Sequence, residues 1–379
     1  MLECKFITNG ISVQQDQVLR PCCTWKFDAE WAKNNRAHEV DIANWHQSES
    51  VLSKKQLLDN NVWPDNCKSC SRREEAGNFG NMRSNGNSAY SDYNDEDITL
   101  EIRPGNVCNL ACQTCWPEAS SRVANYQYRA GLIDKRPVDT TIQSFDFLEP
   151  IAHRIRDVVL LGGEPFYDKN CKKFLEWSQQ NLNATQMIFT NGVVIDYNFL
   201  KNYSGKIILI FSLDAVGKSA EYVRLGTDWN KVSENYARCK QLDNVEVRVN
   251  VTTSVYNYLY IKPLLEFLAN DWPDLITISS VDDDHLRIKT IPMQHRGKIV
   301  SELIDAQEII KKIEMPEHQA QHVSNAIKVI ISELNNAEFD HSSHLYLRRY
   351  IKSLDRVKNV KIEDYCPELV DILQISTEQ

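Results

Sequence analysis

Three cysteines close together are the first residues in this sequence whose type and spacing could support chemistry. Cys108, Cys112 and Cys115 follow the pattern C-x3-C-x2-C. A structural zinc site uses four ligands, and no fourth Cys or His lies nearby. A 4Fe-4S cluster held by only three thiolates keeps one iron open to a further ligand. The spacing therefore favours such a cluster, with an ordinary metal knuckle as the alternative.

The residues on either side of the triplet predict where it lies in the fold. The strand-like run ITLEIR at 98–103 precedes it, and Pro117 follows it. Proline suits the first position of a helix because that position needs no backbone N–H. We therefore expect the cysteines on a loop at the carboxyl end of a strand, where α/β folds keep their chemistry.

A second group of cysteines lies nearer the N-terminus. Eight of the 11 cysteines fall in the first 115 residues, which in a reducing compartment indicates metal binding rather than disulfides. A predicted hairpin, residues 6–13 and 18–21, ends at Cys22-Cys23, and Cys67 and Cys70 form a C-x2-C pair. A four-ligand site can be built from Cys4, either Cys22 or Cys23, Cys67 and Cys70. These residues alone leave zinc and iron–sulfur equally open.

Composition and charge narrow the class of protein. The chain has 379 residues, of which 42% are hydrophobic and 25% charged, as in ordinary globular proteins. Its net charge is −9, whereas nucleic-acid-binding proteins usually carry an excess of basic residues. We find no signal peptide and no apolar run long enough to span a membrane. The sequence predicts a cytoplasmic protein without a nucleic-acid or membrane partner.

Three parts are predicted along the chain: residues 1–95, 96–295 and 296–379. Residues 80–97 are rich in Asn, Ser, Gly and Asp, which is typical of a linker. From residue 98, short apolar runs alternate with helical patterns, which favours an α/β fold with a parallel sheet, such as a partial (β/α)6 TIM-like barrel. The predicted strands are 98–103, 158–161, 187–190, 207–211, 245–251 and 275–281; the predicted helices are 118–132, 169–182, 196–203, 230–242 and 257–270. The last part reads as a helical extension without an assigned chemistry, with helices at 298–312, 317–335, 342–352 and 363–375.

A glycine-rich turn follows the second predicted strand. It comprises Gly162, Gly163, Glu164 and Pro165. Glycines at the end of a strand let a ligand approach the backbone closely. Since the carboxyl ends of parallel strands share one edge, we expect this turn on the same rim as the cysteine triplet.

Together, the C-x3-C-x2-C and Gly-Gly-Glu-Pro motifs resemble the signature of the radical S-adenosylmethionine (SAM) superfamily. The resemblance implies that Cys108, Cys112 and Cys115 ligate a 4Fe-4S cluster whose open iron is chelated by SAM. It implies that Gly162–Pro165 holds the amino group of SAM. It further implies that polar residues at later strand ends contact SAM, which here are Asn191, Ser212, Asp214, Arg224 and Asn250. Arg224 could pair with the SAM carboxylate, and Asp214 could instead cap a helix.

Residues 1–95 resemble the twitch domain, a hairpin-and-helix module that holds an auxiliary 4Fe-4S cluster in some radical SAM enzymes. The resemblance rests on residues 20–23 (RPCC), 67–70 (CKSC) and 75–77 (EAG). Here the module precedes the predicted barrel, whereas it more often follows it. An auxiliary cluster could anchor the substrate or carry an electron.

The activity that the resemblance implies is reductive cleavage of SAM to methionine and a 5′-deoxyadenosyl radical, which abstracts a hydrogen atom from a substrate. The electron would come from a reductant of flavodoxin or ferredoxin type. The substrate stays unidentified, with a peptide as one candidate class. The main rival is a zinc-stabilised binding protein that uses both cysteine groups structurally. It does not explain three cysteines without a fourth, and an iron-free SAM methyltransferase gives the triplet no role.

Overall fold

A computed structural model describes residues 2–75, 81–137 and 140–375 of the chain. They form two compact units. Unit one comprises Met1–Asn106, Asp139–Ile188 and Tyr197–Ile207; unit two comprises Val107–Val138, Phe189–Asp196 and Ile208–Gln379. Each unit takes segments from more than one of the three predicted parts. The assignment of separate roles to residues 1–95, 96–295 and 296–379 stays a prediction.

The sheet of unit one contains five strands in the order β2-β1-β3-β4-β5. Their bounds are β1 (Gly10–Val13), β2 (Leu19–Arg20), β3 (Ile98–Ile102), β4 (Ile155–Leu160) and β5 (Thr185–Thr190). Strands β1 and β2 form the predicted antiparallel hairpin. Strand β1 also pairs in parallel with β3, with Val13 opposite Ile102. The N-terminal hairpin therefore extends the sheet, which the sequence did not predict.

Helices cover the strands of unit one. They are α1 (Lys5–Asn9), α2 (Ala29–Asn34), α3 (Glu49–Asp59), α4 (Lys68–Glu75), α5 (Met82–Ala89), α7 (Lys169–Asn181) and α8 (Tyr197–Asn202), with the 3-10 turns η1 (Ile42–Gln47), η2 (Asp65–Cys67) and η3 (Asp146–Arg154). Helix α1 replaces the first residues of the predicted hairpin strand because Phe6 packs against Tyr90 and Tyr93.

The predicted linker at 80–97 is wrong in its middle, where α5 lies. The side chain of Asn81 accepts a hydrogen bond from the N–H of Ser84 at 3.2 Å, and the Ser84 hydroxyl accepts one from the N–H of Asn81 at 3.2 Å. Asn and Ser are common in loops, but they are also the residues that cap a helix N-terminus. The polar residues Asn81 and Ser84, which suggested a linker, therefore cap the start of helix α5.

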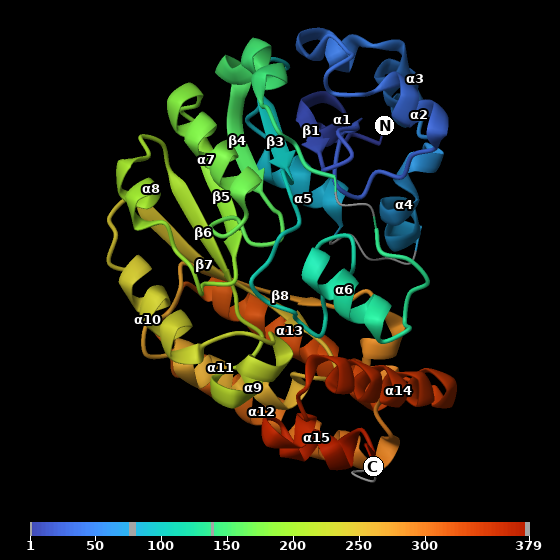
Figure 1. Cartoon of the computed structure of the whole chain (residues 1–379), viewed down its shortest axis with the longest axis vertical. Coiled ribbons are helices and arrows are strands. Elements are labelled where there is room, and N and C mark those ends of the chain that lie inside the picture. The colour runs from blue at the N-terminus through green and yellow to red at the C-terminus, as the bar shows by residue number, and fades with distance from the viewer. Residues whose placement is uncertain (1, 76–80, 138–139, 376–379) are drawn as a thin grey trace. The chain divides into compact units, whose positions relative to one another are not determined.

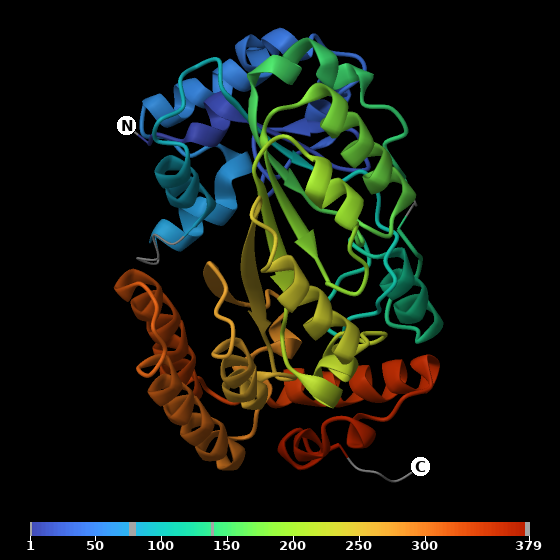
Figure 2. The same cartoon turned by 90° about the vertical axis from the view of Figure 1, so that its left-hand side faces the viewer.

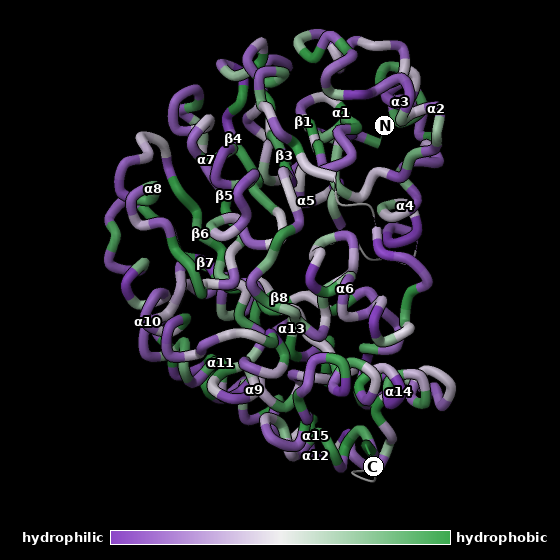
Figure 3. The backbone as a smooth tube through the Cα atoms, viewed as in Figure 1, coloured by the Kyte–Doolittle hydropathy of each residue, from purple (hydrophilic) through white to green (hydrophobic). Residues whose placement is uncertain are grey.

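Unit two contains three strands in the order β6-β7-β8: β6 (Ile207–Ser212), β7 (Val245–Thr253) and β8 (Leu275–Ser280). Strands β7 and β8 are parallel. Strand β6 is buried along nearly its whole length, and β7 alternates between buried and half-buried residues. Strand β6 appears as an apolar stretch in Figure 3.

Eight helices of the described residues belong to unit two: α6 (Ser121–Arg129), α9 (Gly217–Val223), α10 (Trp229–Cys239), α11 (Ile261–Leu268), α12 (Met293–Ile310), α13 (Glu317–Asn336), α14 (His341–Lys358) and α15 (Pro367–Ile372), with the 3-10 turns η4 (Tyr258–Tyr260), η5 (Asp284–Leu286), η6 (Ile288–Thr290) and η7 (Ile362–Asp364). Figures 1 and 2 show that α14, near the end of the chain, lies beside α6. This places the C-terminal extension next to the helix that follows the cysteine triplet.

The α/β fold class is confirmed, and so are the six strands predicted from residue 98 onward and the four C-terminal helices. The six-fold barrel and the twitch architecture stay predictions. Within residues 2–75, 81–137 and 140–375, no helix is both long and apolar enough to cross a membrane.

Candidate functional site

The cysteine triplet lies in unit two on the loop before α6, and its three side chains are half-buried. Two backbone hydrogen bonds anchor this loop to the end of α9. The N–H of Ala111 donates to the carbonyl of Leu225 at 2.8 Å, and the N–H of Gln113 donates to the carbonyl of Val223 at 2.8 Å. Cys112 is therefore held between two anchored residues.

Gly226 allows the loop to approach this closely. Its φ of +98° lies in the region that glycine adopts without strain. A Cβ at this position would lie 3.3 Å from the carbonyl oxygen of Asn109 and 3.3 Å from a methyl group of Leu110. The contact between the cysteine loop and the turn after α9 therefore depends on a residue without a side chain.

Arg224 is a cation that lies near the triplet. Its Nε lies 2.7 Å from a carboxylate oxygen of Asp214, whose side chain is fully buried. Asp214 also accepts a hydrogen bond from the N–H of Thr252 at 2.8 Å. Burial lowers the pKa of Arg224, but the negative charges of Asp214, Cys112 and Cys115 outweigh it and raise the pKa above the usual range.

Lys358, the last residue of α14, is a further cation near the triplet. Its ammonium donates to the carbonyl of Ala111 at 3.1 Å and to Oε1 of Gln113 at 2.9 Å. Burial lowers the pKa of Lys358 to about 8, while the charges of Cys112, Asp355 and Cys115 oppose the shift. Burial raises the pKa of Cys112, and Arg224 and Lys358 oppose that shift. Positively charged side chains therefore lie near the cysteines that would bind a cluster as thiolates.

The structure brings some of the other predicted SAM residues of unit two to the triplet. The amide of Asn191 lies 3.8 Å from the sulfur of Cys108 and donates to Oδ1 of Asn109 at 2.8 Å. Ser212 ends β6 and Asn250 lies in β7, where its carbonyl accepts from the N–H of Leu213 at 3.1 Å. Their contacts with SAM stay predictions, as does the pairing of Arg224 with the SAM carboxylate.

The glycine-rich turn belongs to unit one, between β4 and α7. A Cβ on Gly162 would lie 2.8 Å from the sulfur of Cys171 and 3.2 Å from the carbonyl of Gly105. Glu164 is buried, and its carbonyl accepts from the N–H groups of Tyr167 at 3.0 Å and Asp168 at 2.8 Å. Tight packing against α7 therefore already requires a glycine at 162. A role of Gly163, Glu164 and Pro165 in binding SAM stays a prediction.

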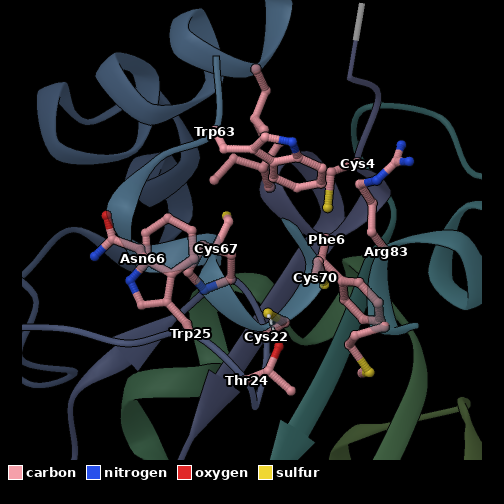
Figure 4. Close-up of a pocket in the computed structure, with 14 residues that line it drawn as sticks. Cys4, Phe6, Cys22, Thr24, Trp25, Trp63, Asn66, Cys67, Cys70 and Arg83 are labelled. Atoms are coloured by element: carbon pink, nitrogen blue, oxygen red, sulfur yellow. Dashed lines mark hydrogen bonds between the residues drawn. The ribbon is translucent and has the colours of Figure 1, made fainter. Parts of the chain in front are cut away.

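The N-terminal cysteines of unit one surround a pocket with an empty volume of about 420 Å³, part of which is open to solvent. Figure 4 shows the sulfur atoms of Cys4, Cys22, Cys67 and Cys70 facing the same space, with the rings of Phe6, Trp25 and Trp63 around them. Burial raises the pKa of the Cys4, Cys22 and Cys67 thiols, that of Cys22 to about 12. This is the cysteine set that the sequence predicted, and it includes Cys22.

Cys23 points elsewhere. Its thiol hydrogen-bonds to the buried carboxyl group of Glu101, and its sulfur lies 4.0 Å from the sulfur of Met82. It does not line the pocket. The sequence alone could not decide between Cys22 and Cys23; Cys22 lines the pocket, and which of the two ligates stays a prediction.

Arg83 is a residue of this pocket that the sequence did not indicate. Its guanidinium makes a two-point ion pair with Glu74, at 2.8 and 2.7 Å, and donates to the carbonyl of Glu3 at 2.7 Å. Its positive charge lowers the pKa of Cys4 against the larger effect of burial. Arg83 therefore ties α4 and α5 to the segment that carries Cys4. Of the residues on which the twitch resemblance rests, 76 and 77 lie outside the described part of the chain.

The donor chemistry of both groups fits iron–sulfur clusters, since thiolates are the ligands that such clusters use. Among the described residues, no group of three or more His, Cys, Asp or Glu side chains is placed to hold a single metal ion.

Comparison with solved structures finds similar chains at low identity. One is anSMEcpe with bound AdoMet: 18% identity, TM-score 0.41, 55% of this chain and 57% of that chain covered. Another is Streptococcus suis SuiB bound to S-adenosylmethionine: 15% identity, TM-score 0.39, 72% and 62% covered. A third is TYW1 with a lysine-pyruvate adduct: 14% identity, TM-score 0.39, 72% and 94% covered. The chain thus spans less than two thirds of the first two proteins. No protein-family model and no curated protein matches this sequence.

Proposed function

We propose that this protein is a radical SAM enzyme, which reductively cleaves S-adenosylmethionine and abstracts a hydrogen atom from a substrate. When bound to Cys108, Cys112 and Cys115, a 4Fe-4S cluster supplies the electron that splits SAM into methionine and a 5′-deoxyadenosyl radical. The observation that carries the proposal is a loop with three thiols in a C-x3-C-x2-C pattern, with Arg224 and Lys358 next to it. A structural zinc site would need a fourth ligand, which the triplet does not supply.

The chain's own residues hold and surround this site. The backbone bonds of Ala111 and Gln113 fix the loop, and the amide of Asn191 lies against the sulfur of Cys108. Arg224 and Lys358 offset negative charge near Cys112 and Cys115. In this proposal Gly162–Pro165 binds the amino group of SAM, and Ser212, Asp214 and Asn250 bind its other polar groups.

We also propose an auxiliary 4Fe-4S cluster on Cys4, Cys22, Cys67 and Cys70. The support is that these four thiols line one pocket while the Cys23 thiol is bonded to Glu101. Four thiolates would fill every iron's outer position, which favours electron transfer over direct binding of the substrate. The substrate stays open, with a peptide as a candidate class, and the reductant would be a flavodoxin or a ferredoxin.

Anaerobic reconstitution with iron and sulfide tests the proposal. We expect about eight irons per chain, four for each cluster, and release of 5′-deoxyadenosine when SAM and dithionite are added. The Cys239→Ala variant is the control, because Cys239 is fully buried in α10. An iron-replete protein that releases no 5′-deoxyadenosine would contradict the proposal. A colourless protein with stoichiometric zinc would support the zinc-binding alternative.

A further inference from the structure

Helix α14 of the C-terminal extension directs several polar side chains toward the cysteine loop and its neighbours. The hydroxyl of Tyr350 accepts a hydrogen bond from the amide of Gln127 in α6 at 3.1 Å. The carboxylate of Asp355 accepts one from the hydroxyl of Tyr222 in α9 at 2.9 Å. Lys358 reaches the loop itself. Helix α14 therefore contacts α9, whose end anchors the cysteine loop, and α6, which follows the triplet.

The end of α14 fixes the position of Lys358. Asn359 follows it with a φ of +55° in the left-handed region, a conformation that often ends helices. The N–H of Val360 donates to the carbonyl of Asp355 at 3.0 Å, and the N–H of Ile362 donates to the Asp355 carboxylate at 3.0 Å. The chain therefore turns away at once, and Lys358 is held at the loop by its own helix end.

The hydrogen-bond acceptors of Lys358 are both uncharged: the carbonyl of Ala111 and the side-chain amide of Gln113. Arg224 differs, because it forms an ion pair with the carboxylate of Asp214. The carboxyl group of Asp355 is the nearby acid, and burial raises its pKa to about 6. Lys358 therefore brings positive charge to Cys112 and Cys115 without a direct carboxylate partner.

We propose that Lys358 is a positioning residue of the cluster site, which holds the loop around Cys112 and makes the bound cluster easier to reduce. The inference rests on the proposed function. A positive charge beside an iron–sulfur cluster favours the reduced, more negative state, and net charge is one of the factors that set its potential. Helix α14 of the C-terminal extension, to which the sequence analysis assigned no chemistry, then contributes Lys358 to the site.

The test is an EPR-monitored redox titration of the reconstituted full-length protein with Lys358→Met, Lys358→Arg and Lys352→Met. The signal to follow is the one that changes when SAM is added, since only a cluster with an open iron responds to it. We expect a more negative midpoint potential and about 10- to 100-fold faster iron loss to a chelator in Lys358→Met. Lys358→Arg should retain most of the wild-type potential. Lys352→Met removes the same charge from an exposed position on the same helix and should match the wild type.

The outcomes separate the two proposals. If the wild-type protein shows no SAM-responsive cluster, the proposed function fails. If the wild type shows one, but Lys358→Met has the potential and iron retention of Lys352→Met, the inference about Lys358 is wrong and the proposed function stands. Equal loss in Lys358→Met and Lys358→Arg of iron retention and melting temperature, without a potential shift, would mean a purely structural role and would also overturn the inference.

Discussion

The two cysteine sites differ in what surrounds their thiols. In unit one, four sulfurs face a pocket walled by Phe6, Trp25 and Trp63, and burial raises the pKa of three of the thiols. In unit two, three sulfurs lie on a half-buried loop among amides and cations. Asn191 contacts Cys108, and Arg224 and Lys358 act on Cys112 and Cys115.

The number of cysteines and the side chains around them indicate the same role for each site. A complete ligand set in an apolar shell leaves no position for a substrate and limits access of solvent, which suits an electron carrier. An incomplete set in a polar shell leaves room for a charged ligand and already contains groups that could bind one. The spacing of the cysteines indicates how many ligands each site has, and the side chains around them indicate what each site can do.

The largest effect should come from removing one whole ligand set at a time. We expect Cys108→Ala/Cys112→Ala/Cys115→Ala to lose about four irons and all release of 5′-deoxyadenosine, because the SAM-binding cluster has no other ligands. Replacing Cys4, Cys22, Cys67 and Cys70 by Ala should also lose about four irons, but should leave SAM cleavage by dithionite in place. Iron analysis and chromatography of the nucleoside measure both.

Two outcomes would contradict these assignments. If the four-cysteine variant also stopped cleaving SAM while it kept four irons and its melting temperature, the two sites would not be independent. If the three-cysteine variant still released 5′-deoxyadenosine, the catalytic cluster would have been assigned to the wrong cysteines.

A smaller and sharper test compares two adjacent cysteines in unit one. Cys22→Ala should lose iron from the pocket, since its sulfur faces the other three thiols. Cys23→Ala should keep the full iron content, since its thiol is bonded to Glu101 on strand β3. The two variants delete the same atom one residue apart, so iron content per chain compares them directly. Equal iron loss in both would show that the direction of the Cys22 side chain does not decide ligation.

Packing around the glycine-rich turn gives a third test. Gly162→Ala should lower the free energy of unfolding by about 1–3 kcal/mol, because the new Cβ would lie 2.8 Å from the sulfur of Cys171. Adding Cys171→Ala removes that sulfur and should restore about 1 kcal/mol. Urea denaturation measures all three proteins. No recovery in the double variant would mean that the carbonyl of Gly105, at 3.2 Å, is the contact that matters.

Gly162→Ala measures the packing of the turn, so Gly163→Ala can be used to test whether the turn binds SAM. We expect the proposed binding turn to lose SAM affinity in Gly163→Ala without loss of iron, because no cysteine is changed. Anaerobic calorimetry on iron-replete protein measures the affinity. Unchanged binding would remove the turn of unit one from the proposed SAM site and leave the triplet of unit two as its main support.

Local patterns in the sequence predicted much of the fold. The six strands from residue 98 onward are short apolar runs, and each was placed to within a few residues. The cysteine triplet was also placed correctly, on a loop between a strand and a helix, but the helix begins at Ser121 after the N-cap Ser120 and not at Pro117. These features depend on neighbours in the sequence, so the sequence reveals them.

The features that were missed depend on residues far apart in the chain. Lys358 donates hydrogen bonds to Ala111 and Gln113, which lie 247 and 245 positions earlier in the chain. A single lysine at a helix end does not indicate such a contact. The parallel pairing of β1 with β3 joins residues about 90 positions apart, such as Val13 and Ile102. The choice between Cys22 and Cys23 depends on which way each side chain leaves the turn after β2, and that is set by Glu101 on another strand.

The smallest expected effect concerns acid stability of the unit that holds the four-thiol pocket. Nε2 of His46 lies 3.0 Å from the carbonyl of Gly10, the first residue of β1. Burial lowers the pKa of His46 to about 4, and the charge of Arg154 adds to this while the Gly10 bond opposes it. In the unfolded chain histidine titrates near pH 6.5. Between about pH 4 and 6.5 the unfolded chain therefore binds more protons, and the folded state loses stability as the pH falls.

His46→Gln should reduce this loss by about 1–2 kcal/mol between pH 7 and 5, measured as the urea midpoint, because glutamine can still donate to Gly10 without gaining charge. His38→Gln, at an exposed histidine of the same unit, is the matched control. An equal effect of both substitutions would place the acid sensitivity outside the contact between His46 and β1.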